Sequence, residues 1–196
     1  RPDARWSDGT PVTADDFIYA WKRILSPELA SDYGEMLHLL KGAADFHTGV
    51  TKDFSTVGVR APDPLTLEVT LENLGETPIG GLLAIEWATT MLGGGANPAA
   101  YYLLGGTRVP HDSAESRTGL ASLSSGNEYV GLDVATAVTP AADVWIAPIE
   151  TISNSEAGFE RVYQGSALVL TWPLDLAPGA LTSVRVEHLV SSRRKR

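Results

Sequence analysis

The first third of the chain has the spacing of an amphipathic helix. Between residues 17 and 25, apolar residues recur every three or four positions, which places them on one helical face. Thr13 is a favourable N-cap, and Asp16 adds negative charge to the first turn. The Ser-Pro pair at 26–27 ends this helix, because the residue before a proline disfavours helical backbone.

Two shorter helices are predicted next. Tyr33, Met36, Leu37 and Leu40 keep the helical spacing. A further helix is expected over residues 41–47. It should end at Gly49, since glycine readily takes the left-handed backbone found at helix C-termini.

The hydrophobic period then changes to two. Residues 57–60 predict a short strand, and the Ala-Pro-Asp-Pro sequence at 61–64 predicts a turn. Residues 65–71 alternate apolar and polar side chains, as a half-buried strand does. The two strands are therefore expected to form a hairpin.

The segment 75–81, Gly-Glu-Thr-Pro-Ile-Gly-Gly, breaks both periods. We expect it to separate two domains, residues 1–75 and 76–196. Many short strands with Gly and Pro between them are typical of a sandwich. The expected fold class is α+β, with a short helical and hairpin piece followed by a mainly antiparallel β-sandwich. Its strands are predicted at 82–90, 99–104, 128–138, 144–151, 166–172 and 182–190.

Composition narrows the classes of function. The 196 residues carry a net charge of −9, which disfavours nucleic acid and anionic membrane surfaces as partners. The absence of cysteine excludes disulfides, thiolate nucleophiles and Cys-ligated zinc. No apolar stretch approaches the roughly 20 residues that span a bilayer. The basic run at 193–196 is interpreted as a solvated tail. The chain begins at Arg1, so we expect a fragment or a mature segment.

Residues 4–74 resemble the oligopeptide- and dipeptide-binding proteins of ABC importers. The resemblance implies an origin in peptide uptake, and the peptide-contacting residues are unknown. The conspicuous residues of this segment have structural roles: Asp8-Gly9 forms a turn, Pro11 stiffens the chain before the helix, and Thr13 caps the helix. The residues that carry the resemblance are Trp6-Ser7-Asp8-Gly9-Thr10-Pro11-Val12-Thr13-Ala14-Asp15-Asp16-Phe17, Tyr19-Ala20-Trp21-Lys22-Arg23, Gly58-Val59 and Leu67-Glu68-Val69-Thr70-Leu71.

Residues 82–190 resemble the C-terminal β-domain of family 57 glycoside hydrolases, the α-amylases and 4-α-glucanotransferases. In that family the domain packs beside a catalytic barrel, which has no counterpart here, so we expect no enzyme activity. The strongest block covers residues 145–160. The other carriers are Ala84-Ile85-Glu86-Trp87, residues 93–98, Tyr101-Tyr102, His111-Asp112-Ser113, Asn127-Glu128-Tyr129-Val130-Gly131, Tyr163-Gln164-Gly165 and Trp172-Pro173-Leu174.

The second resemblance implies sugar contacts rather than catalysis. Carboxylates and amides hydrogen-bond sugar hydroxyls, and aromatic rings stack on sugar faces. Glycoside hydrolysis needs two carboxylates about 5 to 10 Å apart, but the family's pair belongs to the barrel. The alternative is that these groups satisfy backbone donors and pair with Arg161. The candidate carbohydrate-binding residues are Glu150, Glu156, Glu160, Tyr163, Gln164 and Trp172.

Other candidate chemistry is interpreted as structural. His111-Asp112 has the composition of a base and its orienting acid, but a turn hydrogen bond is favoured because no nucleophile motif flanks it. His38, His47 and His188 are too scattered for a local metal pair, so no metal and no cofactor are expected. The triple glycine at 93–95 lacks the Gly-Lys-Ser/Thr of a phosphate loop and predicts a loop between strands.

Three functions remain open. The chain is a non-catalytic composite with a carbohydrate-associated β-module, a solute-binding component for peptide uptake, or a chimera without selected function. Its ligand is accordingly an α-glucan or a peptide. The apolar helical face is expected to pack on the β-half or on a second copy of the chain. The first resemblance implies a periplasmic or extracellular location, and the second allows a cytoplasmic one.

Overall fold

The computed structural model describes residues 5–90, 93–155 and 158–192. It forms two compact units. Unit 1 comprises residues 1–81 and 174–186, and unit 2 comprises residues 82–173 and 187–196. Unit 1 therefore takes residues from both sides of the segment 75–81.

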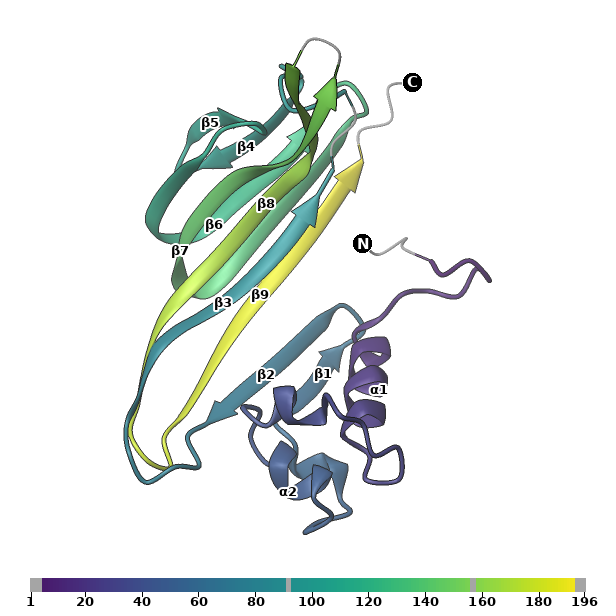
Figure 1. Ribbon diagram of the computed structural model, residues 1–196, viewed down its shortest axis with the longest axis vertical. Coiled ribbons are helices and arrows are strands. Elements are labelled where there is room, and N and C mark those ends of the chain that lie inside the picture. Colours follow the sequence, from purple (N-terminus) through teal and green to yellow (C-terminus); the bar gives the residue numbers. More distant parts are fainter. Residues whose placement is uncertain (1–4, 91–92, 156–157, 193–196) are drawn as a thin grey trace. The chain divides into compact units, whose positions relative to one another are not determined.

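Figure 1 shows the helices gathered at the start of the chain and long strands in the rest. Unit 1 begins with α1 (Ala14–Leu25), the 3-10 helix η1 (Gly34–Leu37), α2 (Ala43–His47), the 3-10 helix η2 (Phe54–Thr56), β1 (Val59–Asp63) and β2 (Thr66–Glu72). The remaining strands are β3 (Ile79–Thr89), β4 (Ala100–Leu104), β5 (Thr107–Pro110), β6 (Glu115–Asn127), β7 (Leu132–Ser155), β8 (Gly158–Leu176) and β9 (Leu181–Ser192).

Helix α1 starts and ends where the sequence predicts. The Asp16 carboxylate accepts a hydrogen bond from the Thr13 backbone N–H at 2.7 Å, closing the first turn. The same carboxylate accepts from Trp6 Nε1 at 3.2 Å. At the other end, the helix stops at Leu25, one residue before Ser26.

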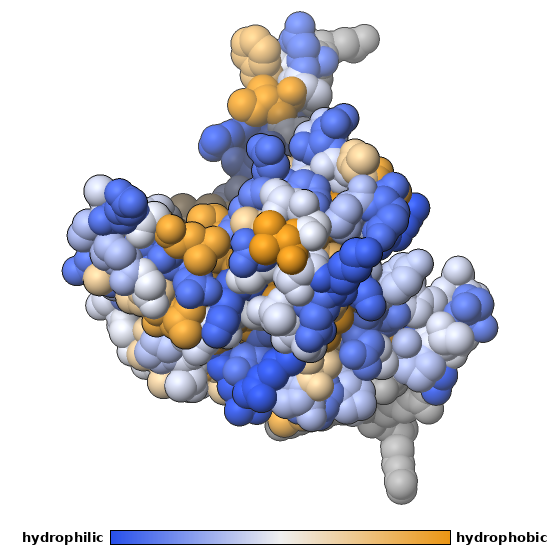
Figure 2. All heavy atoms as spheres, turned by 90° about the horizontal axis from the view of Figure 1, so that it is seen from below, coloured by the Kyte–Doolittle hydropathy of each residue, from blue (hydrophilic) through white to orange (hydrophobic). Residues whose placement is uncertain are grey.

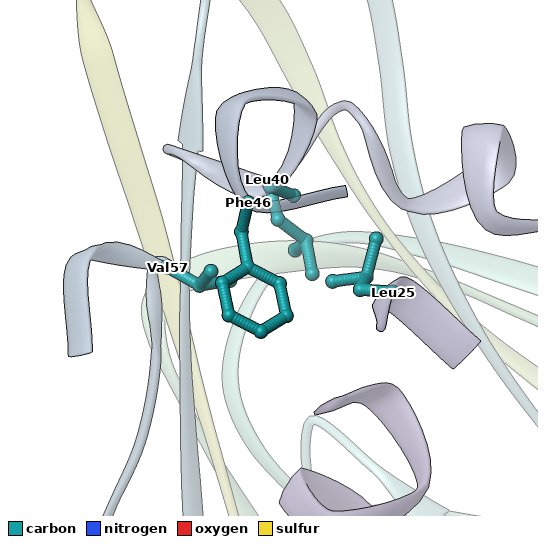
Figure 3. Packing of buried hydrophobic residues seen from close by; sticks show 5 residues of the cluster. Leu25, Leu40, Phe46 and Val57 are labelled. Carbon is teal, nitrogen blue, oxygen red and sulfur yellow. The ribbon is translucent and has the colours of Figure 1, made fainter. Parts of the chain in front are cut away.

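A small apolar core holds unit 1 together. Figure 3 shows Leu25 from α1 meeting Leu40, Phe46 and Val57, all of them buried. The neighbouring helical residues Trp21, Ile24 and Leu37 are partly buried against this cluster.

The predicted apolar face of residues 33–40 is only partly realised. This segment forms the single 3-10 turn η1 instead of a full helix, so Tyr33 and Met36 are exposed. In α1, Phe17 is also exposed. Figure 2 shows hydrophobic residues reaching the surface as separate patches bordered by polar ones. In the described part of the chain, no helix has both the length and the apolar character needed to cross a membrane.

The C-terminal segment adds a third strand to the predicted hairpin. Strand β2 pairs with β1 through Val69 and Val59, and on its other edge with β9 through Val69 and Val184. The pairing of β2 with β9 continues to Glu72 opposite Leu181. A strand from the end of the chain therefore completes the sheet on which the N-terminal helices lie.

Asn73 fixes the end of this three-stranded sheet. Its side chain is fully buried, and Nδ2 donates to the carbonyls of Leu176 at 2.8 Å and Thr77 at 2.9 Å. Its Oδ1 accepts from the backbone N–H of Gly75 at 2.9 Å. One amide thus joins backbone positions more than a hundred residues apart in sequence.

Unit 2 is a folded antiparallel sheet. Strand β6 pairs with β4 and β7, β5 pairs with β4, and β8 pairs with β7 and β3. Strand β8 is three ladder positions from β4, about 14 Å away in a flat sheet. Yet the His111 side chain lies within 3.3 Å of both Ser166 on β8 and the Tyr101 carbonyl on β4. The sheet therefore folds over onto itself.

The folded sheet encloses one apolar core in unit 2. This arrangement confirms the predicted α+β class with a mainly antiparallel β-sandwich. Buried side chains alternate with outward ones along the strands, as the period of two requires. The core residues are Tyr102, Leu104, Val109, Leu123, Val138, Val144, Ile146, Leu168, Leu170 and Trp172.

Some strand boundaries differ from the prediction. The expected strands at 128–138 and 144–151 are joined in one strand, β7, which begins only at Leu132 because residues 128–131 form a turn. Strands β5 and β6 were not expected. Strand β6 is rich in Ser, Thr and Gly and contains only Leu120 and Leu123 as large apolar residues. Its pattern therefore resembles a loop, although β4 and β7 pair with it on both edges.

We expect Asn73→Ala to lower the free energy of unfolding by about 1 to 3 kcal/mol, because it leaves the buried Leu176 carbonyl without its donor and removes the bonds to Thr77 and Gly75. The adjacent Leu74→Ala removes an exposed side chain and should cost less than about 0.5 kcal/mol. Urea denaturation of both variants measures the difference, and equal costs would contradict the assigned role of the amide.

Candidate functional site

The end of β7 and the start of β8 form a hairpin, and one face of this hairpin carries aromatic, aliphatic, charged and amide side chains. Figure 1 shows this hairpin extending beyond the ends of β4 and β5. Across the hairpin, three pairs of residues stand directly opposite each other and so share a face. We call this face the hairpin shelf, and its pairs are Glu150 with Tyr163, Ile152 with Arg161, and Asn154 with Phe159.

The shelf adjoins the loop at residues 93–98. Tyr163 donates or accepts a hydrogen bond with Ser166 Oγ at 2.6 Å. A β-carbon placed on Gly95 would lie only 2.7 Å from Tyr163 Cδ2 and 2.8 Å from Asp112 Cβ. The loop therefore packs directly on the Tyr163 ring, and glycine at position 95 is what permits this approach.

A hollow lies beside the same loop. Its floor includes Tyr101, over whose ring the Arg108 guanidinium stacks at 4.0 Å from the centroid. Arg108 also forms an ion pair with Glu128 at 2.7 Å. Asn97 and Asp112 complete the polar part of the lining.

The shelf presents both apolar and charged side chains to solvent. Phe159 is 84% exposed and Ile152 is 65% exposed. Arg161 Nη2 lies 3.4 Å from Glu150 Oε2. An ion pair at this exposure contributes little stability, so a ligand can exchange hydrogen bonds with either group at little cost. An exposed ring beside polar groups suits a ligand with one apolar face and hydroxyl edges.

The structure separates the residues predicted to bind carbohydrate. Glu150 and Tyr163 lie together on the shelf. Glu160 is exposed on the opposite face of the hairpin, and Gln164 donates to Thr151 Oγ1 at 3.0 Å. Trp172 is buried, and its Nε1 donates to the Pro140 carbonyl at 2.9 Å. Glu156 lies outside the described residues.

Four shelf residues, Ile152, Asn154, Phe159 and Arg161, were not among the candidate carbohydrate-binding residues. The signal that could have found them is their cross-strand pairing. That pairing is hidden by a bulge, because Ile149 pairs with Gly165 and Glu150 with Tyr163, which leaves Gln164 as an extra residue on β8.

His111 belongs to the interior of unit 2. It is fully buried, its ring stacks on Tyr102 at 4.1 Å between centroids, and Nε2 lies 3.1 Å from the Tyr101 carbonyl. Burial lowers the pKa of His111, against smaller upward effects of the Tyr101 carbonyl and Asp112. With no exposed surface, the ring serves packing and hydrogen bonding. Its partners Tyr101, Ser125 and Ser166 lie on other strands, so these bonds join strands and are not the turn hydrogen bond that the sequence favoured.

One expectation about histidines was wrong. His38 and His47 are not scattered, because His38 Nε2 lies 2.8 Å from His47 Nδ1. Gly42 takes the left-handed backbone (φ 66°) between η1 and α2, which reverses the chain and brings the two rings together. Gly34 leaves room for the His47 ring, since a β-carbon there would lie 2.5 Å from it.

Comparison with known families gives a match over most of the chain. The profile of the α-amylase/4-α-glucanotransferase C-terminal family matches residues 32–185. α-Amylase 1 of Dictyoglomus thermophilum is 34% identical over 113 residues, which are 56% of this chain and 16% of that enzyme. The crystal structure of 4-α-glucanotransferase from Thermococcus litoralis matches 67% of this chain and 20% of that chain, with 20% identity and a TM-score of 0.39.

A second group of relatives matches a shorter segment. The periplasmic oligopeptide-binding protein OppA of Escherichia coli is 48% identical over 73 residues, which are 36% of this chain and 13% of that protein. This chain therefore spans less than a fifth of the length of these curated relatives in either group.

Stability should depend on pH through His111. Burial lowers the pKa of His111 in the folded chain. As the pH falls below the ordinary histidine pKa of about 6.5, the unfolded chain therefore binds more protons at this residue than the folded chain does. The contribution is fully present above that pH and is lost on acidification, by at most about 1.4 kcal/mol per pH unit. We expect His111→Gln to flatten this part of the profile in urea denaturation between pH 5 and 8. Burial also lowers the pKa of His188, so His188→Gln measures how much of the pH dependence comes from this second histidine. An unchanged slope in His111→Gln would contradict the assignment.

Proposed function

This chain belongs to the α-amylase/4-α-glucanotransferase C-terminal family, and from that premise we propose that it is a non-catalytic composite whose β-module binds α-glucan. The printed activities of the relatives are those of much longer proteins, of which this chain spans a small part. A role in holding glucan, rather than cleaving it, is the function that the matched segment supports best.

The hairpin shelf is the observation that carries this proposal. A glucose ring has an apolar C–H face, which can pack on Phe159, and a hydroxyl edge, which can bond to Glu150 and Arg161. The large exposed area of Phe159 is available for burial by a ligand. The shelf thus offers both kinds of contact that a neutral sugar uses.

The composition of the described shelf residues supports a binding role. Hydrolysis of a glycosidic bond needs a pair of carboxylates about 5 to 10 Å apart. Among the shelf residues that the structure describes, Glu150 is the one carboxylate, and its neighbour Arg161 forms an ion pair with it.

We propose further that the segment 75–81 marks the junction between residues 1–75, derived from a peptide-binding protein, and residues 76–196. The 73-residue match to oligopeptide-binding proteins supports this division. It also supports a second candidate function, peptide binding. If residues of unit 1 bind peptide, the fluorescence of Trp6 and Trp21 should change on titration with a peptide library, and a flat signal would exclude it.

Calorimetric titration with maltooligosaccharides tests the glucan proposal. We expect heat of binding at millimolar sugar from the folded wild-type chain, and at least a tenfold weaker affinity in Phe159→Ala because the stacking surface is lost. Leu189→Ala removes another exposed apolar side chain of unit 2 and should bind as the wild type does. No heat from a folded wild-type sample, or equal affinities of the two variants, would overturn the proposal.

A further inference from the structure

Trp145 stands exposed on the outer face of the sheet. It lies in β7, between β6 and β8, opposite Ser116 on one side and Val169 on the other. Its neighbours along the strand, Val144 and Ile146, are 0% and 2% exposed, whereas Trp145 is 56% exposed. Side chains alternate along a strand, so the indole points away from the core that its neighbours fill.

The surroundings of Trp145 leave its ring open. The side chains directly opposite it, Ser116 and Val169, are small, and the outward residues before and after it on β7 are Asp143 and Ala147. None of these four is large enough to cover an indole plane. The tryptophan is therefore a flat, apolar platform that shares its face with the Ser116 hydroxyl and the Asp143 carboxylate.

The size of this platform limits what can occupy it. A tryptophan side chain buries about 150 to 250 Å2, whereas a stable protein interface buries about 800 Å2 on each partner. A second copy of the chain would thus need contacts far beyond one indole among small residues. The Asp143 carboxylate on the same face and the net charge of −9 also disfavour nucleic acid. A neutral ring of the size of one or two sugar units fits the platform.

We propose that Trp145 is a second glucan contact, on the face of the sheet opposite the hairpin shelf. Five positions separate Trp145 from Glu150 on β7, and the bulge falls on β8, so the two side chains point to opposite faces. The indole stacks on the C–H face of a glucose unit, and Ser116 Oγ bonds to a hydroxyl. This inference rests on the proposed glucan binding.

Two contacts on opposite faces have a consequence for polymeric ligands. One short oligosaccharide cannot reach both faces of a packed sheet, but the many chains of insoluble starch can occupy both. Binding at the first contact raises the effective concentration of neighbouring chains at the second. Trp145 therefore matters more for insoluble starch than for a short oligosaccharide bound at the shelf.

The full chain tests the inference in parallel assays with granular starch and maltotriose. We expect Trp145→Ala to weaken starch binding at least tenfold, and Trp145→Phe to keep most of it. Leu189→Ala serves as the control for loss of an exposed apolar side chain. Thermal unfolding of Trp145→Ala should match the wild type, because the indole is outside the core.

The outcomes separate this inference from the proposed function. Starch binding by Trp145→Ala equal to that of the wild type, with loss in Phe159→Ala, would overturn the role of Trp145 and leave the glucan-binding function standing. No binding of either sugar by the wild type would overturn both. A wild type that is dimeric by size-exclusion chromatography, with a monomeric Trp145→Ala variant, would assign the platform to a second copy and overturn the glucan contact.

Discussion

The buried amide of Asn73 holds the end of β2 against the returning chain. Its two donor bonds and one acceptor bond meet backbone groups at the chain turn and at the end of β8, and the buried Leu176 carbonyl among them would be costly to leave unpaired. The adjoining pairing of β2 with β9 gives the hairpin a third strand. An isolated two-stranded hairpin is only marginally stable in water, so both this third strand and the packing of β1 and β2 against the helical core stabilise the sheet of unit 1.

Buried polar groups also need hydrogen-bond partners in the interior of unit 2, where several of them lie between the two layers of the folded sheet. Ser166 donates to the His111 carbonyl at 2.6 Å, and Tyr163 bonds to the same hydroxyl. The network continues from the core to the shelf, because Tyr163 belongs to both. The position of the shelf is thus fixed by the bond from Ser166 on β8 to the His111 carbonyl and by the close approach of Gly95 to Tyr163. A surface built on paired strands and anchored in this way is more precisely held than a surface loop.

Much of this architecture could be predicted from local patterns, and the rest depended on long-range pairing. Helix α1 follows from its apolar spacing and from the Thr13 and Asp16 cap, which act within one turn. Strand β6 could not be predicted, because its small polar residues become a strand only when β4 and β7 pair with it. The contact of His38 with His47 was missed for a related reason, since the sequence does not show that Gly42 reverses the chain between them.

At the candidate site, amino-acid composition predicted the right segment of the chain, but strand register decides which of its side chains lie together. Sequence could indicate that the segment around Glu150 and Tyr163 suits sugars, but six residues in one stretch do not reveal which side chains share a face. A single extra residue, Gln164, shifts the pairing so that Tyr163 stands opposite Glu150, and it leaves Glu160 on the other face from Glu150. Trp145 and Glu150 face opposite sides because five positions separate them on β7, which has no irregularity between them. The two aromatic surfaces of unit 2 therefore follow from the period of β7, and the composition of the shelf follows from the bulge in β8.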